Sequence, residues 1–269
     1  MSSAGQAALL GVVQGLTEFL PVSSSAHLIL ARAVFGFDGD KFGLSFDVAC
    51  HVGTLVAVLV YFRRDLVRMI GALPALLHPA SDEDAQLIWL LAIGTLPAVV
   101  CGVLFRRVIE ESLRTPAVAV LMLAAGALLL LLAEWAGAKS RAGSALTPAD
   151  AFWIGCAQAL ALVPGVSRSG ATLTVGLLTG LRRADAARFV FLLAIPAILG
   201  AAVSEAGAAR RALAVPGVST LFLIGVITSA VVGYAAVRYL IRYLSSHSLA
   251  VFAWYRLVLA GAVTVWFLR

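Results

Sequence analysis

Two short polar stretches, which resemble each other, interrupt an otherwise apolar chain and limit how it can fold. The first is GVVQGLTEFLPVSSSAH at 11–27, and the second is GCAQALALVPGVSRSGA at 155–171. A shift of 144 positions pairs Gly11 with Gly155, Gln14 with Gln158, Leu16 with Leu160, Val22 with Val166, Ser23 with Ser167 and Ser25 with Ser169. Both stretches contain a proline, Pro21 or Pro164. Because proline interrupts a helix, each stretch predicts two helical pieces joined by a break.

The composition predicts a membrane protein. Hydrophobic residues make up 61% of the chain and charged residues only 13%, which is too little charge for a soluble domain of 269 residues. The net charge is +6, and the basic residues gather in short loops, which indicates membrane topology rather than nucleic-acid binding. We expect no cleavable signal peptide, because the N-terminus lacks a basic region and a cleavage site. Cys50, Cys101 and Cys156 are isolated and predict neither a metal site nor a disulfide.

Six apolar stretches approach the length of about 20 residues that a membrane-spanning helix needs. They are 44–62, 87–105, 117–135, 187–206, 218–240 and 249–268. Basic or proline-containing segments separate them and are predicted to be loops, at 63–68, 106–116, 210–211 and 238–247. The two polar stretches do not fit a simple span, because interrupted backbone is tolerated at membrane depth only where protein or a wet cavity satisfies it. We therefore predict re-entrant helical hairpins at 5–35 and 151–181.

The repeat extends weakly beyond the hairpins, and it predicts the overall architecture. Ile93-Gly94 matches Ile224-Gly225, and the run 125–127 matches 260–262. Each half, 1–135 and 151–269, would hold one hairpin and three spans, with a polar linker at 136–150. Three is odd, so the second half would be inverted relative to the first. The predicted fold is an all-α polytopic membrane protein with six transmembrane helices and two re-entrant hairpins in an inverted-topology repeat.

Inversion predicts that the hairpin tips meet inside the bilayer and build one shared site. Glu18, Ser24 and His27 of the first hairpin would then approach Arg168 of the second. Neither copy holds the full set, since Leu162 stands at the position of Glu18 and Arg168 itself stands at that of Ser24. Ionisable groups are costly in hydrocarbon and usually mark a working site.

The second tip has the features of an anion cradle. Ser167, Arg168 and Ser169 follow Pro164-Gly165, where a new helix would begin and offer free N–H groups. The guanidinium of Arg168 suits phosphate oxygens, which makes phosphate the best candidate for the anion. The predicted substrate-binding residues are the polar side chains around both tips, namely Ser23, Ser25, Ser167, Ser169, Thr172 and Gln158.

On these motifs, the chain resembles the undecaprenyl-pyrophosphate phosphatases of the bacitracin-resistance family. The resemblance rests on QGLTEFLPVSSSAH at 14–27 and PGVSRSGAT at 164–172, and it extends to FLLAIPAILG at 191–200 and FAWYR at 252–256. It implies interlocked inverted repeats and removal of the terminal phosphate from undecaprenyl pyrophosphate, which regenerates the carrier lipid for wall synthesis. It also implies a divalent cation, Mg²⁺ or Ca²⁺, and an outward-facing site in the bacterial inner membrane.

Carried over by position, the resemblance assigns the functional residues Glu18, Ser24, His27 and Arg168. Gln14 stands where some relatives have Glu, so the expected metal ligands are Glu18 and the weaker amide oxygen of Gln14. Asp47 is a candidate substitute acid, and the alternative is a helix-start residue at the interface.

Three mechanisms remain open. Ser24 attacks the terminal phosphorus with His27 as its base, since the two lie three residues apart on one helical face; this is the preferred hypothesis. Alternatively, His27 is itself the nucleophile, or Glu18 or His27 activates water. In all three, Arg168 and a metal stabilise charge on the phosphoryl oxygens.

Further expectations concern the remaining polar residues and the rival functions. His51 is predicted to be a hydrogen-bonded packing residue, and Arg256 to pair with a carboxylate, reach substrate phosphate or extend to the interface. Lys and Arg residues are slightly more numerous on one face, which places both termini outside. The expected partner is the polyprenyl pyrophosphate lipid, with a homodimer as a further possibility. A lipid-phosphate transporter or flippase is the rival function, because such proteins share inverted repeats and broken helices.

Overall fold

The chain folds into a bundle of apolar helices. The computed structural model describes residues 2–39, 41–79, 82–214 and 216–267. Within these ranges, five helices are long and apolar enough to cross a membrane. They are α3 (Leu44–Tyr61), α5 (Glu83–Leu104), α7 (Pro116–Ala136), α10 (Arg183–Leu213) and α11 (Val218–Leu244). The chain is thus a multi-pass membrane protein. The sixth predicted span coincides with the apolar helix α12 (Ala250–Phe267), and its predicted end at 268 lies outside the described residues.

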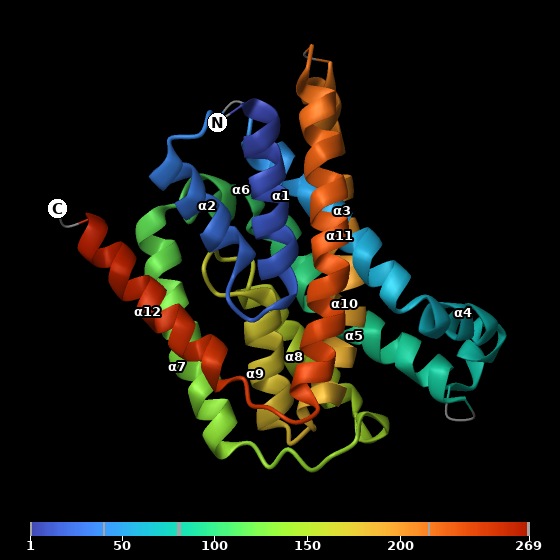
Figure 1. The fold of residues 1–269 in the computed structure, drawn as a ribbon. Coiled ribbons are helices and arrows are strands. Elements are labelled where there is room, and N and C mark those ends of the chain that lie inside the picture. The colour runs from blue at the N-terminus through green and yellow to red at the C-terminus, as the bar shows by residue number, and fades with distance from the viewer. Residues whose placement is uncertain (1, 40, 80–81, 215, 268–269) are drawn as a thin grey trace.

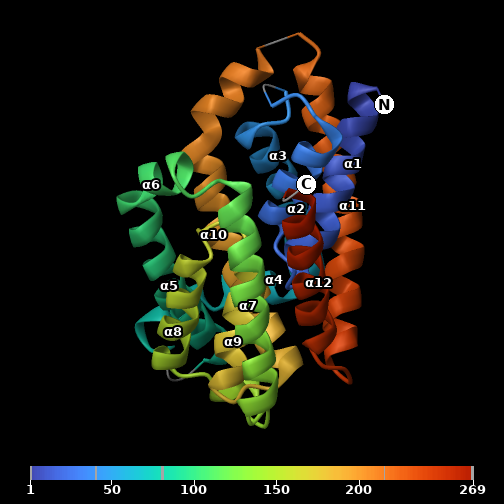
Figure 2. The same cartoon turned by 90° about the vertical axis from the view of Figure 1, so that its left-hand side faces the viewer.

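Two helical hairpins lie at the positions of the polar stretches. The first consists of α1 (Ser3–Phe19) and α2 (Ser24–Phe35), and the second of α8 (Pro148–Leu160) and α9 (Arg168–Leu178). The hairpins enter the bundle from opposite ends, and their connecting segments approach each other near its middle (Figures 1 and 2). The predicted breaks at the two prolines are confirmed.

Each hairpin packs on a helix of the other half of the chain. Helix α1 lies along α11, and α8 lies along α5. The approach is close in both pairs: a Cβ on Gly11 would lie 2.8 Å from the carbonyl oxygen of Gly225, and one on Gly155 would lie 2.4 Å from that of Gly94. Small residues permit such close packing of membrane helices. These four glycines are also paired by the sequence repeat, so both halves use the same type of contact.

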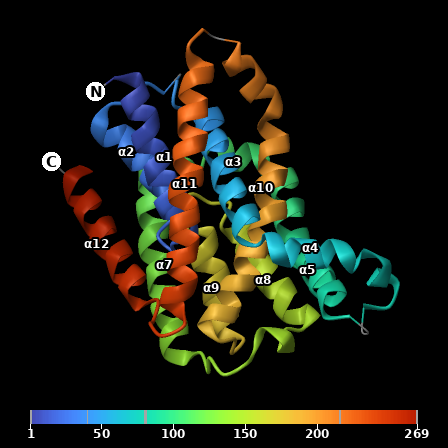
Figure 3. The same cartoon turned by 45° about the vertical axis from the view of Figure 1, so that its right-hand side comes forward.

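Several predicted loops are helical. Segment 63–68 lies in α4 (Arg63–Gly71), and part of 106–116 forms α6 (Arg106–Glu111). The predicted loop at 210–211 belongs to α10, and α11 continues through most of 238–247. These segments lack an internal proline or glycine, and charge pairs such as Arg68 with Asp65, at 2.6 Å, stabilise a helical turn. Helix α4 and the 3-10 helix η1 (Leu73–Leu77) project from one side of the bundle (Figure 3).

The linker between the halves is anchored to the base of the second hairpin. It contains the short 3-10 helix η3 (Gly143–Ala145), and Arg141 donates to Asp150 at 2.8 Å and to the carbonyl of Thr179 at 2.6 Å. Thr147 and Asp150 form a capping box at the start of α8. Burial raises the pKa of Asp150, but the hydrogen bonds from Arg141 and Thr147 outweigh it, so the pKa lies below its ordinary value. The linker therefore sets where the second hairpin begins.

Candidate active site

The two hairpin tips share an unusual backbone conformation. Ser23 has φ 73° and Ser167 has φ 72°, and each directly precedes the second helix of its hairpin. The left-handed region is costly for a residue with a Cβ, by about 1–3 kcal/mol, so the surrounding structure must hold it. The Oγ of each serine lies 3.3 Å from that of the serine two residues later, Ser25 or Ser169. The repeated sequence thus produces the same strained turn twice.

Glu18 connects the two hairpins. Its side chain is buried, and its Oε1 accepts a hydrogen bond of 2.5 Å from the guanidinium of Arg168. Its Oε2 accepts from the hydroxyl of Ser24 at 2.6 Å and from the amide of Gln14 at 2.8 Å. The predicted meeting of Glu18 with Arg168 across the two tips is confirmed. The site therefore combines a carboxylate, a hydroxyl and a guanidinium in direct contact.

His27 is oriented differently from the preferred hypothesis. Its Nδ1 lies 2.8 Å from the carbonyl oxygen of Ser23, so this nitrogen donates, and its Nε2 accepts from the hydroxyl of Tyr255 at 2.8 Å. The two rings are stacked, with centroids 5.7 Å apart. Both ring nitrogens are thus engaged elsewhere, while Ser24 donates to Glu18. The geometry places the carboxylate of Glu18, rather than the imidazole of His27, in contact with the hydroxyl of Ser24.

The other predicted substrate-binding hydroxyls support the broken backbone. Ser25 accepts from the N–H of Gly165, and Ser167 accepts from that of Gly170. Ser169 donates to the carbonyl of Leu20 at 3.0 Å, which joins the two tips, and Thr172 donates to the carbonyl of Arg168 at 2.7 Å. Thr172 is fully buried, which differs from its predicted contact with substrate. These groups stabilise the tips, and Arg168 and Ser24 remain the residues best placed for an anion.

His51 belongs to the site, although it matches neither motif. Its Nε2 lies 3.3 Å from Oε2 of Glu18, and its Nδ1 lies 2.7 Å from the carbonyl oxygen of Asp47, to which it must donate. The signal in the sequence was a histidine within an apolar span, where an ionisable group is functional by default. The prediction of a hydrogen-bonded residue is correct, because Nδ1 donates to the carbonyl of Asp47, and Nε2 also contacts the central carboxylate.

Asp47 does not act as a second carboxylate beside Glu18. It lies in the first turn of α3, and its buried side chain accepts two hydrogen bonds from Arg32, at 2.6 and 3.0 Å. Arg114 approaches the same carboxylate at 3.4 Å. The structure agrees with the alternative of a helix-start residue, now fixed by an ion pair.

Arg256 on α12 is fully buried and binds backbone carbonyls, which none of its three predicted roles described. Its nitrogens donate to carbonyl oxygens from α7 and from both hairpin tips. The acceptors are Met122, Leu123, Pro21, Gly165 and Val166, at 3.0 to 3.5 Å. These include carbonyls that the interrupted helices leave without a helical partner. Arg256 therefore fixes the two tips relative to each other.

Two buried glutamines bear on a cation site. Among the described residues, Oε1 of Gln14 and both amide atoms of Gln158 have no hydrogen-bond partner. No group of three His, Cys, Asp or Glu side chains that would hold a metal is found in the same ranges. The free oxygen of Gln14, beside the carboxylate of Glu18, nevertheless fits a hard cation that takes its remaining ligands from a phosphate and from water. Gln158 has no carboxylate four residues later in its hairpin, because Leu162 stands at the position that corresponds to Glu18.

Comparisons with known proteins identify the family of this chain. The family described as "Bacitracin resistance protein BacA" matches residues 7–262. The undecaprenyl-diphosphatase of Rubrobacter xylanophilus is 51% identical over 261 residues, which cover 96% of each chain. Those of Moorella thermoacetica and Geobacter sulfurreducens are each 44% identical, covering 98% and 96% of both chains, respectively. Because the match covers nearly the whole chain, including both hairpins, the protein belongs to the BacA family of bacitracin resistance proteins.

Proposed function

We propose that this protein hydrolyses undecaprenyl diphosphate to undecaprenyl phosphate and phosphate, which recycles the carrier lipid for cell-wall synthesis and confers resistance to bacitracin. The contact of Glu18 with both Ser24 and Arg168 is the observation that carries this proposal. It supplies a nucleophile, a base and a cation for phosphoryl oxygens at one point. The names of the relatives agree with this activity.

The contacts support a two-step mechanism through a phosphoserine. The hydroxyl oxygen of Ser24 bonds to the terminal phosphorus, and Glu18 takes the hydroxyl proton over the 2.6 Å hydrogen bond. The bond from that phosphorus to the bridging oxygen breaks, and the lipid monophosphate leaves with the electron pair. Arg168 stabilises the charge on the terminal oxygens. Water then bonds to the phosphorus of the phosphoserine while the bond from that phosphorus to the Ser24 oxygen breaks. Glu18 returns its proton to the Ser24 oxygen, and phosphate leaves with both protons of the water.

Glu18 and Gln14 are the residues that would hold a divalent cation, Mg²⁺ or Ca²⁺, at this site. Such a cation would neutralise charge on the diphosphate and polarise its oxygens. The unpartnered Oε1 of Gln14 supports this assignment. Arg168 already pairs with Glu18, so the cation and the guanidinium would share one carboxylate.

The arrangement of helices supports six spans and two re-entrant hairpins in an inverted repeat. The periplasmic face of the inner membrane is the side to which we propose that the site opens, as the resemblance to the family implies. The opposite entry of the hairpins, the matching turns at Ser23 and Ser167, and the paired glycine contacts favour inversion. The excess of basic residues on one face favours external termini.

Phosphate release from the purified protein tests the activity, and Ser24→Ala, His27→Ala and Arg168→Ala test the roles. We expect the serine and arginine variants to lose nearly all turnover, and the histidine variant to retain more than either. Trapping labelled enzyme should give an acid-stable phosphoserine that is absent from Ser24→Ala. An acid-labile phosphoenzyme that His27→Ala abolishes would instead establish the histidine as nucleophile. A transporter would release no phosphate and would relocate labelled lipid in vesicles.

A further inference from the structure

The imidazole of His51 faces the central carboxylate with its second nitrogen. Nδ1 of His51 lies 2.7 Å from the carbonyl oxygen of Asp47, and a carbonyl can only accept, so Nδ1 carries the ring proton. In the neutral ring, Nε2 therefore presents a lone pair, and it lies 3.3 Å from Oε2 of Glu18. Histidines that bind metal ions commonly donate their other ring nitrogen to a carbonyl or a carboxylate. The carbonyl of Asp47 thus orients His51 as a metal ligand would be oriented.

Oxygen ligands lie beside this nitrogen. Among the described residues, Oε1 of Gln14 is buried without a hydrogen-bond partner, while Nε2 of the same amide donates to Oε2 of Glu18 at 2.8 Å. The 3.3 Å between Nε2 of His51 and Oε2 of Glu18 suits two ligands of one ion, since ligands about 2.1 Å from an octahedral ion lie about 3.0 Å apart. Oε2 also accepts from Ser24 at 2.6 Å, so an ion held there would lie beside the proposed nucleophile.

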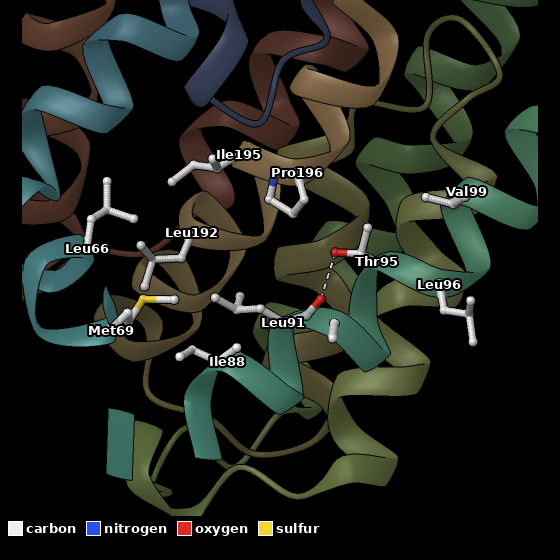
Figure 4. A pocket seen from close by; sticks show the side chains of 11 residues that line it. Leu66, Met69, Ile88, Leu91, Thr95, Leu96, Val99, Leu192, Ile195 and Pro196 are labelled. Carbon is white, nitrogen blue, oxygen red and sulfur yellow. Dashed lines mark hydrogen bonds between the residues drawn. The ribbon is translucent and has the colours of Figure 1, made fainter. Parts of the chain in front are cut away.

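Two pockets between α5 and α10 lack such a ligand set. In the apolar pocket, which has a volume of about 400 Å³, Thr95 already donates its hydroxyl proton to a backbone carbonyl (Figure 4). In the polar pocket, Arg68 pairs with Asp84 at 3.3 Å and Arg182 pairs with Asp185 at 2.6 Å. No histidine is among the described residues that line either pocket. The combination of an imidazole, a carboxylate and an unpartnered amide oxygen is therefore a feature of the hairpin site.

We propose that His51 is the third ligand of the divalent cation at the candidate active site, together with Glu18 and Gln14. The inference rests on the cation site proposed above, and it predicts which ion this chain favours. Mg²⁺ and Ca²⁺ prefer ligand sets made of oxygen, whereas an imidazole nitrogen suits divalent transition metals. One nitrogen and two oxygens therefore favour a transition metal such as Mn²⁺ over Ca²⁺. The side chain of His51 is 27% exposed, which leaves the ion room for phosphate and water ligands.

Electron paramagnetic resonance with Mn²⁺ as the probe tests this inference without measuring turnover. The purified full-length protein is loaded with less Mn²⁺ than protein, and the modulation of the electron spin echo reports whether a nitrogen nucleus is bound to the ion. We expect a nitrogen modulation in wild type that His51→Gln removes, because an amide oxygen then replaces the ring nitrogen. His27→Gln is the matched control and should keep the signal, since both ring nitrogens of His27 are engaged by Ser23 and Tyr255.

The affinities give a second measurement. In His51→Gln, the Kd for Mn²⁺ should rise about tenfold or more, because the nitrogen ligand is lost. The Kd for Ca²⁺, measured by displacement of Mn²⁺, should change by less than about threefold, because an amide oxygen suits that ion. Wild type that carries isotopically labelled histidine should also show an altered nitrogen modulation, and this result does not depend on the folding of any variant.

The outcomes separate this inference from the proposed activity. If bound Mn²⁺ gives no nitrogen modulation in wild type, or if His51→Gln keeps the modulation and the affinity of wild type, His51 is not a ligand. Loss of the signal in His27→Gln alone would assign the nitrogen to His27 and overturn the inference. If wild type binds neither Mn²⁺ nor Ca²⁺, the cation site and its third ligand are both wrong, whereas phosphate release from undecaprenyl diphosphate by the same preparation would still support the activity.

Discussion

A single methyl group added to α7 should disable the site without touching any of its reacting residues. Gly126 packs against Arg256, and a Cβ built on this glycine would lie 2.2 Å from Nη2 of the arginine. Carbon and nitrogen atoms need roughly 3.5 Å, so Gly126→Ala forces the guanidinium away by about 1 Å. That nitrogen holds the carbonyls of Met122, Gly165 and Val166 at 3.0 to 3.1 Å. A displacement of this size lengthens all three contacts beyond hydrogen-bonding distance.

The expected cost follows from the groups left unpaired. Each buried carbonyl that loses its donor costs about 1–3 kcal/mol, so we expect Gly126→Ala to reduce the free energy of unfolding by about 3 kcal/mol. Because Gly165 and Val166 directly precede the turn at Ser167, Arg168 should also move relative to Glu18. A misplacement of about 1 Å reduces turnover by about 100-fold. The assay is phosphate release and thermal unfolding of the purified protein in one detergent.

The sequence repeat supplies the control. Gly261 corresponds to Gly126, but a Cβ there meets no atom within 4 Å. Gly261→Ala should therefore keep full activity and gain up to about 1 kcal/mol from helix propensity. The reasoning is refuted if Gly126→Ala is as active and as stable as Gly261→Ala. Arg256→Lys should resemble Gly126→Ala, because one ammonium group cannot reach carbonyls on three segments.

Three further predictions concern groups around the site. Gln14→Glu should lower the concentration of Mg²⁺ or Ca²⁺ that half-saturates phosphate release, because a carboxylate binds a hard cation better than an amide does; an unchanged requirement would remove Gln14 from the cation site. Tyr255→Phe removes the hydroxyl that donates to His27 while keeping a ring to stack on it, and turnover should fall about fivefold, or about 1 kcal/mol. Asp150→Asn should reduce the free energy of unfolding at neutral pH by about 1 kcal/mol, which is measured as a lower unfolding temperature. Since folding lowers the pKa of Asp150, wild type should lose this advantage as the pH falls through the folded pKa, and a constant difference down to low pH would argue against the ion pair.

The sequence predicted the parts of the fold that depend on local pattern and on the repeat. Proline positions located both breaks, and the hypothesis of an inverted repeat predicted the contact of Glu18 with Arg168. Spacing alone did not determine the partner of Ser24. Because α2 begins at Ser24, this side chain points back toward α1, whereas the ring of His27 lies against α12. The position of α12 depends on tertiary packing and is not encoded in the local motif.

The sequence did not predict the partners of Arg256 or the contact of His51 with Glu18. Arg256 binds carbonyl oxygens of the backbone, which every residue possesses, so the residue types in the sequence do not indicate which groups are its partners. His51 reaches Glu18 only because α3 packs beside α1. The short helices α4 and α6 were missed for another reason: charged segments between spans were interpreted as loops, although charge pairs stabilise them as helices.

The asymmetry of the two hairpins explains why one symmetric scaffold holds a single site. Both tips repeat the strained serine and a buried glutamine, so the repeat preserves the shape of the turn. The chemistry differs: Gln14 donates to a carboxylate, whereas Gln158 is buried without a partner because Leu162 replaces that acid. An unpaired buried amide costs about 1–3 kcal/mol, which the second hairpin tolerates. A carboxylate at that position would compete with Glu18 for Arg168 and would repel an anionic substrate. The second hairpin therefore contributes a cation to the site of the first.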